Sequence, residues 1–369
     1  MENIVISAVN LVDGGPFTVL RDCLESLAVS DIVKRYQVVA LVNNRRDLPE
    51  AGINYIEYPK AKQHYIYRLY YEYFTFRKVS KKYKPKLWLS LHDMSPRVVA
   101  DVQAVYMHNS IPFYKPKLRD WKFVPINAIW AYLYKYLYRI NIHSNNYLVV
   151  QQNWLREEFS KMFSFRKDKI IVAKPIVDNT DVLESGFCRN KNHVFSFIYP
   201  AYPRVFKNFD VICEAVKILE KEGLSNFKVY LTVDGNENKY SKYLTETYSN
   251  LKNVEFIGLQ PKDKMPTLYS ESDCLLFPSK LETWGLPLSE YQPYNKPIIV
   301  SDLPYAHESC EGASKVAFVN MDDPNCLAEK MKELINNDMS SFASVPKKMI
   351  DEPYTSSWKE LFDVLLRTK

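Results

Sequence analysis

Two glutamates flank a glycine-proline corner in the stretch LETWGLPLSE. Glu282 precedes the corner and Glu290 follows it, with Gly285, Leu286 and Pro287 between them. Proline is favoured in the first turn of a helix, because its missing N–H would be unpaired there anyway. We therefore expect a helix to start near Leu286, with free N–H groups that suit phosphate and carboxylates that could accept hydrogen bonds from sugar hydroxyls. A single glutamate here could also be a partner of the helix dipole.

A basic pair lies earlier in the chain, in the stretch YPAYPRVFKNFD. Arg204 and Lys207 are three residues apart, after a buried-strand candidate and just before a helix that should start near Asn208. Two cations beside a helix N-terminus are well suited to a diphosphate, which they bind through charge-assisted hydrogen bonds. The alternative is a solvated pair of loop charges.

A glycine pair follows the first strand candidate, in the stretch NLVDGG. Gly14 and Gly15 stand between this strand and a helix, where glycine lets backbone N–H groups approach an anion. A tight turn that needs positive φ would use glycine as well. Pro16 follows the pair and removes one N–H donor. The dinucleotide fingerprint G-x-G-x-x-G is absent, which argues against an oxidoreductase that binds nicotinamide or flavin.

Two more strand ends carry side chains that could act on a substrate. His108 follows the strand in AVYMH, and Asp93 ends the stretch LWLSLHD. A neutral histidine can donate to a substrate hydroxyl or polarise a developing charge. A lone histidine can also be simply packed and satisfied. We take His108 as the main candidate and Asp93 as a secondary one.

Strands alternate with helices in two series, which predicts an α/β chain with parallel sheets. In such sheets ligands bind beyond the carboxyl ends of the strands. We expect a first domain over residues 1–175, a polar linker over 176–192, a second domain over 193–352 and a final helix within 353–369 that packs back on the first domain. The buried-strand candidates are residues 4–9, 36–42, 87–93, 104–108, 147–151, 193–201, 227–235, 254–258, 274–279, 297–301 and 316–319.

Together these motifs resemble the retaining glycosyltransferases of the GT-B fold that are numbered family 4. The stretch ETWGLPLSE matches the family's Glu-x7-Glu signature, and SESDCLLFPS is similar to its lead-in. The basic pair, the early glycine pair and the histidine of YMHNSIPFY match further family positions, although the family often has Gly-Arg where this chain has AYPR. YPAYPRVFKN and YMHNSIPFY are similar to a subgroup found in bacterial surface-polysaccharide clusters.

The resemblance implies two Rossmann-like domains that face each other across a cleft, the first binding the acceptor and the second the nucleotide sugar. Glu290 would bind the donor ribose, Glu282 the hydroxyls of the transferred sugar, and His108 the sugar near the reacting carbon. Arg204 and Lys207 would stabilise the leaving nucleoside diphosphate, from a UDP or GDP hexose, in place of a metal ion. No cofactor is expected. The implied donor-binding set is Gly14, Gly15, Arg204, Lys207, Gly285, Leu286, Pro287 and Glu290.

Basic and aromatic residues are concentrated in the first half of the chain. Residues 60–122 hold 14 lysines and arginines against 4 acidic residues. The stretches 65–86 and 115–140 mix these with Tyr, Trp and Phe, a texture typical of contact with an anionic membrane surface. A helix packed inside the first domain is the alternative. RNA binding is a third interpretation, but no nucleic-acid motif is present, so we expect no nucleic-acid partner.

The remaining composition indicates a cytoplasmic protein. No signal peptide and no run of about 18 apolar residues is visible, and the 6 cysteines show neither C-x-x-C nor zinc-ligand spacing. We therefore expect reduced thiols and peripheral attachment at the inner face of the cytoplasmic membrane. The leading interpretation is a glycosyltransferase with a lipid-linked or polysaccharide acceptor. A non-catalytic subunit that binds a nucleotide sugar or a membrane, and a Rossmann oxidoreductase, are the alternatives.

Overall fold

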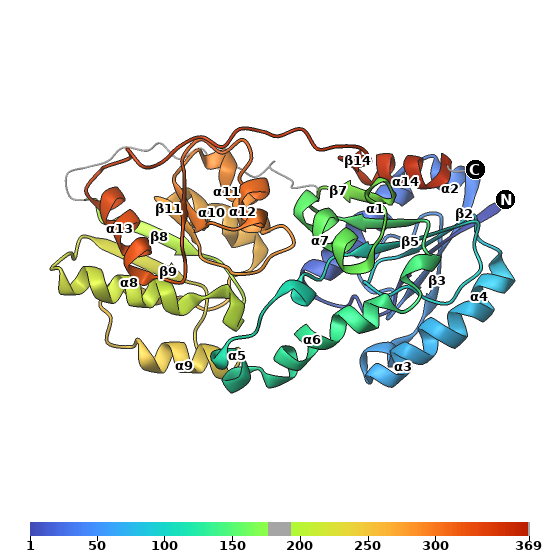
Figure 1. Ribbon diagram of the computed structural model, residues 1–369, viewed down its shortest axis with the longest axis horizontal. Helices are drawn as coiled ribbons and strands as arrows, with labels where there is room; N and C mark the ends of the chain where they lie inside the picture. Colours follow the sequence, from blue (N-terminus) through green and yellow to red (C-terminus); the bar gives the residue numbers. More distant parts are fainter. Residues whose placement is uncertain (176–192, 368–369) are drawn as a thin grey trace. The chain divides into compact units, whose positions relative to one another are not determined.

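The chain divides into two compact units, shown as a computed structural model in Figure 1. The structure describes residues 1–175 and 193–367, so the predicted linker over 176–192 lies outside the described residues. The N-terminal unit comprises Met1–Phe113, Trp130–Ile176 and Ile350–Lys369, and the C-terminal unit comprises Tyr114–Ile129 and Val177–Met349. The segment 114–129, which the sequence places in the first domain, therefore groups with the second unit.

The N-terminal unit is built on a parallel sheet in the order β14-β7-β6-β5-β4-β1-β2-β3. The strand order reverses between β1 and β4, which makes the carboxyl ends of these two strands the topological switch point of the sheet. The strands are β1 (Glu2–Ala8), β2 (Tyr36–Val42), β3 (Ile53–Glu57), β4 (Leu87–Ser90), β5 (Val102–Met107), β6 (Tyr147–Val150), β7 (Ile170–Ala173) and β14 (Tyr354–Thr355).

The C-terminal unit repeats this plan with a parallel sheet in the order β10-β9-β8-β11-β12-β13. Here the order reverses between β8 and β11, and Asp273 links these two strands by accepting hydrogen bonds from the backbone N–H and the hydroxyl of Ser196. The strands are β8 (Phe195–Tyr199), β9 (Phe227–Leu231), β10 (Val254–Phe256), β11 (Cys274–Phe277), β12 (Ile298–Ser301) and β13 (Val316–Val319).

Helices cover both faces of the sheets, so the central strands are buried on both sides. In β1, Ile4 and Ile6 pack on one face against α1 and α14, whereas Val5 packs on the other face against Phe76 and Trp88. This alternation follows from the period of two along a strand. The N-terminal half contains α1 (Gly14–Val29), α2 (Ile32–Arg35), α3 (Tyr65–Tyr70), α4 (Phe76–Tyr83), α5 (Leu118–Phe123), α6 (Pro125–Arg139) and α7 (Asn153–Phe163). The later helices are α8 (Phe209–Lys221), α9 (Lys239–Thr247), α10 (Met265–Glu271), α11 (Leu286–Tyr291), α12 (Pro304–Ser309), α13 (Pro324–Ile335) and α14 (Trp358–Arg367).

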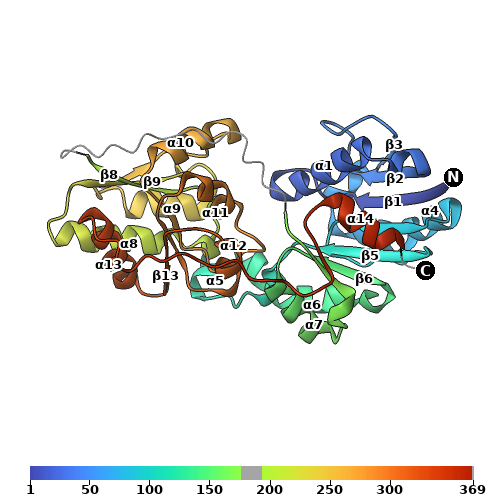
Figure 2. The ribbon, with the colours of Figure 1, turned by 90° about the horizontal axis from the view of Figure 1, so that it is seen from above.

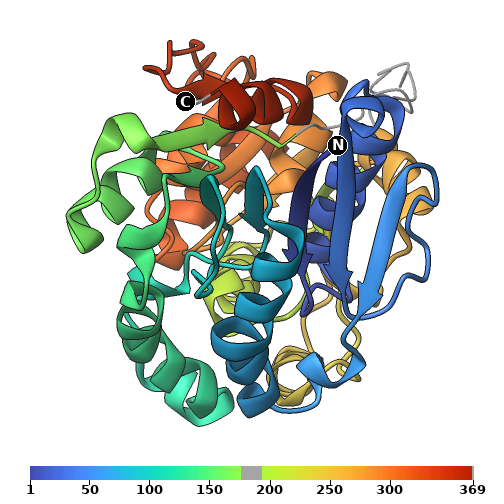
Figure 3. The ribbon, with the colours of Figure 1, turned by 90° about the vertical axis from the view of Figure 1, so that its right-hand side faces the viewer.

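The last helix, α14, belongs to the N-terminal unit. It lies between α1 and β5, as Figure 2 shows. Leu361, Phe362 and Leu365 are fully or almost fully buried in the same core cluster as Ile4 and Ile6. In Figure 3 this helix is seen at the top of the parallel strands of the N-terminal unit.

Several element boundaries differ from the sequence-based ones. The predicted strand over 87–93 ends at Ser90, so His92 and Asp93 lie in the loop after it. β3 and β7 were not among the predicted strands, and both are short runs, INYIE and IIVA. Within the described residues, no helix is both long and apolar enough to cross a membrane.

Candidate functional site

The loops after β8 and β11 bring Lys207 and Glu282 together at the switch point of the C-terminal sheet. Lys207 ends a short 3-10 turn, Val205–Lys207, and its Nζ forms an ion pair with Glu282 Oε1. The two side chains are only 18% and 13% exposed. Tyr199, at the end of β8, fixes the loop because its hydroxyl donates to the carbonyl of Lys207 at 2.8 Å. A lysine and a glutamate held this way are placed to bind an anionic group and a hydroxylated group side by side.

The glycine-proline corner has the predicted helix start. Gly285 is the N-cap residue of α11 with φ +83°, and α11 begins at Leu286 with Pro287 in its first turn. A Cβ on Gly285 would lie 3.2 Å from Phe277 and 3.3 Å from Leu288. Both the backbone conformation and the space therefore require glycine at this position.

Replacing Gly285 with alanine should destabilise the protein by about 2–4 kcal/mol, from left-handed strain and from overpacking together. Urea unfolding followed by circular dichroism measures this loss. Gly223→Ala is the matched control, since Gly223 has φ +85° but no atom within 4 Å of the place a Cβ would take. An equal loss in both variants would show that the contacts with Phe277 and Leu288 contribute nothing.

The other two candidates on this unit have different surroundings. Glu290, in α11, accepts a hydrogen bond from the hydroxyl of Tyr269 at 2.9 Å. Arg204 is exposed, and its guanidinium lies 5.9 Å from the ring centroid of Phe206. The structure thus brings Lys207 and Glu282 into contact, whereas Arg204 extends into solvent.

On the N-terminal unit, Asp93 and His108 form a pair at the ends of β4 and β5. Asp93 Oδ1 accepts hydrogen bonds from the backbone N–H groups of His108 at 2.7 Å and Asn109 at 2.9 Å. Asp93 Oδ2 lies 3.2 Å from His108 Nε2. The carboxylate therefore faces Nε2 of the imidazole, and Nδ1 is a buried ring nitrogen without a hydrogen-bond partner among the described residues.

The glycine pair lies at the start of α1, on the other side of the same switch point. Gly14 has φ +63°, so a residue with a side chain would be strained there. At Gly15 neither the backbone conformation nor the space requires glycine, since no atom lies within 4 Å of where a Cβ would be. Both are exposed, so their backbone is accessible to a ligand.

Sequence reasoning did not identify a buried polar cluster behind Asp93. His92 Nε2 forms a hydrogen bond with Ser7 Oγ at 3.0 Å. His92 Nδ1 also lies 3.0 Å from Glu72 Oε1, but this second contact lacks the alignment of a hydrogen bond. His92 and Glu72 are completely buried. Burial, together with the positive charge of Arg68, keeps the pKa of His92 well below its ordinary value, so the imidazole is neutral. Glu72 lies in a π-helical turn, Tyr71–Thr75, which no pattern in the sequence announces.

The buried carboxyl of Glu72 should make stability depend on pH. Burial raises its pKa from 4.5 to about 8. Between these values the unfolded chain releases the proton and the folded chain keeps it. The contribution of Glu72 to the free energy of unfolding is therefore present below about pH 4.5 and is lost as the pH rises through 8. Glu72→Gln cannot ionise, so its melting temperature should rise relative to the wild type from pH 5 to pH 8.5. Glu50→Gln, at an exposed position, should show no such trend, and a flat difference for Glu72→Gln would contradict the expectation.

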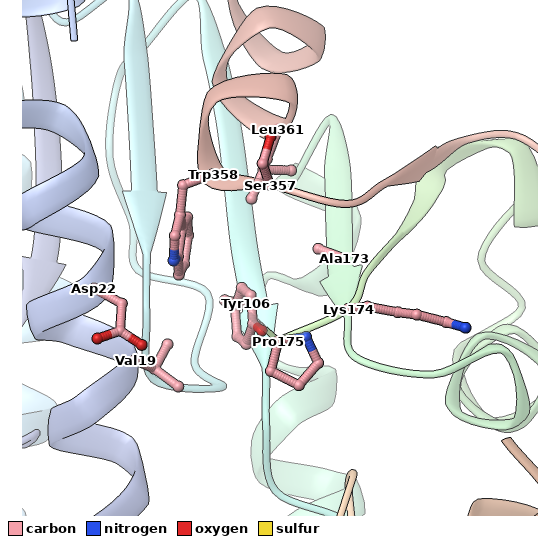
Figure 4. Close-up of a pocket in the computed structure, with 9 residues that line it drawn as sticks. All are labelled: Val19, Asp22, Tyr106, Ala173, Lys174, Pro175, Ser357, Trp358 and Leu361. Atoms are coloured by element: carbon pink, nitrogen blue, oxygen red, sulfur yellow. The ribbon is translucent and has the colours of Figure 1, made fainter. Parts of the chain in front are cut away.

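One pocket of the N-terminal unit lies apart from the candidate residues. It is a small hollow, partly open to solvent, between α1, the ends of β5 and β7, and the start of α14. Figure 4 shows Trp358 and Tyr106 along one wall and Asp22 directed toward them. The rings of Tyr106 and Trp358 are stacked with centroids 5.6 Å apart.

The segment 114–129 packs beside the loop of the C-terminal unit that carries Arg204 and Lys207. Arg119 forms an ion pair with the buried Asp210 at 2.7 Å, and Lys117 donates to Asp322 at 2.7 Å. Asp322 also pairs with Lys280, and Asp323 caps α13 by accepting from the backbone N–H of Asn325. Within the described residues the two aspartates thus have separate structural roles, Asp322 in ion pairs and Asp323 in a helix cap.

Comparisons with known proteins agree with this architecture. Residues 189–352 match the family of Glycosyl transferases group 1. The O-antigen chain mannosyltransferase RfbU of Salmonella typhimurium is 22% identical over 272 residues, which span 73% of this chain and 70% of that protein.

Solved structures show the same fold at low sequence identity. The sucrose-phosphate synthase of Thermosynechococcus elongatus has a TM-score of 0.65 and 13% identity, covering 91% of this chain and 90% of its own. Alr3699/HepE of Anabaena, solved in complex with UDP-glucose, has a TM-score of 0.59 and 13% identity, covering 94% and 93%. Residues 189–352 thus match a Glycosyl transferases group 1 domain, and the chain as a whole, with its two parallel α/β sheets, has the fold of these solved structures.

Proposed function

We propose that this protein is a retaining, metal-independent hexosyltransferase that uses UDP- or GDP-sugars to build a cell-surface polysaccharide. The observation that carries the proposal is the ion pair between Lys207 and Glu282 at the switch point of the C-terminal sheet. In a group 1 domain, Lys207 would neutralise the leaving diphosphate and Glu282 would accept hydrogen bonds from the sugar. Glu290 would accept from the ribose, and Arg204 would close on the diphosphate.

The names of similar proteins support the class of donor and product. One relative is named as an O-antigen chain mannosyltransferase, and one structural neighbour was solved with UDP-glucose. We therefore assign this chain to surface-polysaccharide synthesis, with a lipid-linked or polysaccharide acceptor.

A thermal-shift screen tests the donor assignment, because a ligand that binds the folded state raises the melting temperature. UDP, GDP, ADP and their hexose sugars are compared, and one nucleotide series should stabilise the protein. Transfer from that donor is then followed by NMR of the product. Retention of the anomeric configuration and full activity in excess EDTA are expected. Inversion, or loss of activity in EDTA that a metal restores, would refute those two parts of the proposal.

An apolar surface on the N-terminal unit supports attachment to a membrane. α3, the turn after it, and α6 lie side by side along one edge of this unit, joined by the stacked rings of Tyr65 and Trp130 (Figures 1 and 3). Their outward side chains are large and apolar although they are exposed: Ile66, Tyr67, Tyr70, Phe74, Tyr132, Leu133 and Tyr136. Lysines and arginines of the 60–122 stretch flank this surface in the sequence, so an anionic membrane fits both its charge and its apolar side chains.

Co-sedimentation with lipid vesicles tests this surface. The protein should bind vesicles that contain anionic lipid more strongly than neutral ones, and the difference should fall with salt. Phe74→Glu, which places a charge at a side chain that is 63% exposed, should weaken binding about tenfold or more. Leu259→Glu on the C-terminal unit, 51% exposed, is the control. Equal binding by both variants would remove this surface from the proposal.

A further inference from the structure

Arg68 connects the surface helix α3 to the end of β4. Its Nη2 donates to the carbonyl oxygen of His92 at 2.8 Å and lies 3.2 Å from His92 Nδ1. The two hydrogens of this one nitrogen can serve both contacts at once, and the planar guanidinium holds them in a fixed direction. Arg68 is half-buried, whereas its helical neighbours Ile66 and Tyr67 are exposed.

His92 is held from several sides. Ser7 Oγ and Glu72 Oε1 each lie 3.0 Å from a ring nitrogen, and the backbone N–H of Met94 donates to the His92 carbonyl at 2.7 Å. Ser7, His92 and Glu72 lie next to one another but do not form a hydrolytic triad, because His92 Nδ1 accepts from Arg68 and so cannot donate to Glu72. All three are fully buried, so no substrate can reach the hydroxyl of Ser7. The cluster therefore serves to hold the chain at His92.

The residue held in place by this cluster is the next one along the chain, Asp93. It has φ +61°, a left-handed conformation that is uncommon for a residue with a side chain. Such strain persists only where the surroundings over-determine the conformation. The backbone N–H of Asp93 donates to the carbonyl of Tyr106 at 3.1 Å. The Asp93 carboxylate oxygen Oδ2 lies 3.2 Å from His108 Nε2.

We propose that Arg68 is a positioning residue for His108. By holding the His92 carbonyl, the guanidinium keeps Asp93 in its left-handed conformation, and the Asp93 carboxylate then fixes the imidazole with Nε2 toward it. The ring then keeps a single orientation, and so does His108 Nδ1, which has no hydrogen-bond partner among the described residues. The effect on sugar transfer rests on the proposed function, whereas the effect on the imidazole does not.

NMR of ¹⁵N-labelled histidine tests the proposal without any substrate. The protein has 6 histidines, and His108→Gln identifies the signals of His108. In the wild type these should report a single tautomer with the proton on Nε2. In Arg68→Met both tautomers should appear, with an exchange-averaged or doubled signal, and Arg68→Lys should show the second tautomer at a lower population. Arg77→Met, a half-buried arginine in the same helical stretch, should leave the wild-type spectrum unchanged.

A merely structural role for Arg68 would lower the melting temperature without changing these signals. Folded Arg68→Met protein with the wild-type His108 spectrum would therefore overturn the proposal. If that variant does not fold, Arg68→Lys decides in the same way, since an unchanged spectrum there would also overturn it.

Kinetics provide the second measurement. In Arg68→Met, kcat for transfer should fall about tenfold or more while the KM for the donor changes by less than about threefold, because only the orientation of His108 is affected. An unchanged kcat would overturn the proposal. If the wild type shows no transfer, the proposed function fails, but the NMR result still decides whether Arg68 positions His108.

Discussion

Replacing Lys207 with alanine is expected to lower kcat/KM for sugar transfer by about 10³-fold. The ammonium lies at the C-terminal switch point with its side chain only 18% exposed, and in the proposed reaction charge on the leaving diphosphate increases as the sugar departs. The variant should still fold, because Lys207 is fixed through its backbone carbonyl by Tyr199, which the substitution leaves in place. Initial rates with saturating acceptor measure the effect.

Glu282→Ala should impair transfer to a similar extent, but for a different reason. Lys207 and Glu282 neutralise each other in the structure. Removing the carboxylate should therefore leave binding of the free nucleoside diphosphate intact or tighter, and should abolish the extra affinity contributed by the sugar. Calorimetric titration with UDP or GDP and with the corresponding sugar nucleotide separates these contributions.

Controls come from a matching ion pair on the surface. Lys242 and Glu246 lie 3.8 Å apart on α9, with both side chains about two-thirds exposed. Alanine at either position should leave transfer and binding unchanged. The assignment of roles would be contradicted if Glu282→Ala weakened the free nucleoside diphosphate as much as Lys207→Ala does.

The second large effect is expected at His108. His108→Ala should lower kcat by about 10²-fold or more, as loss of a group that donates to or polarises the reacting sugar does. Asp93→Asn should cost less, because an amide oxygen can still accept from the backbone N–H groups of His108 and Asn109 but no longer carries the charge that faces Nε2. The ratio of the two losses measures how much of the effect depends on imidazole orientation.

His143→Ala serves as the control for this comparison. His143 is exposed in the same unit and stacks only on Phe165, with ring centroids 6.0 Å apart. Its replacement should leave kcat unchanged. A fall of less than about threefold for His108→Ala would show that this residue is merely packed.

The fold was largely predictable because its central strands are buried on both faces. Residues 36–42 read as one apolar run and form β2 with those bounds. The corner at Gly285 and Pro287 was also predictable, since the chemistry of both residues marks a helix start. In contrast, INYIE forms β3 at the edge of its sheet with only Ile53 fully buried, so its pattern carries too little apolar signal.

The candidate site was predictable where residues follow strands at a switch point, and not where side chains reach across the fold. Lys207 and Glu282 are 75 residues apart, and each follows a central strand, so topology alone brings them near each other. Glu72 and Arg68 lie in a helical stretch that is rich in tyrosine and resembles a surface helix. Their contacts with His92 depend on a π-helical turn and on the exact path of β4, which local spacing does not encode. The roles of the site residues stay predictions that the variants above can test.

The packing of residues 114–129 on the C-terminal unit limits how this enzyme can be divided. A fragment that starts at 177 would lose Arg119 and leave the buried carboxylate of Asp210 without its guanidinium. It would also lose Phe123 from the rings of Tyr240 and Tyr243. Chimeras that exchange the N-terminal unit between related proteins should therefore keep 114–129 together with the C-terminal unit. A cut made only at the linker would join two halves that each lack a native neighbour.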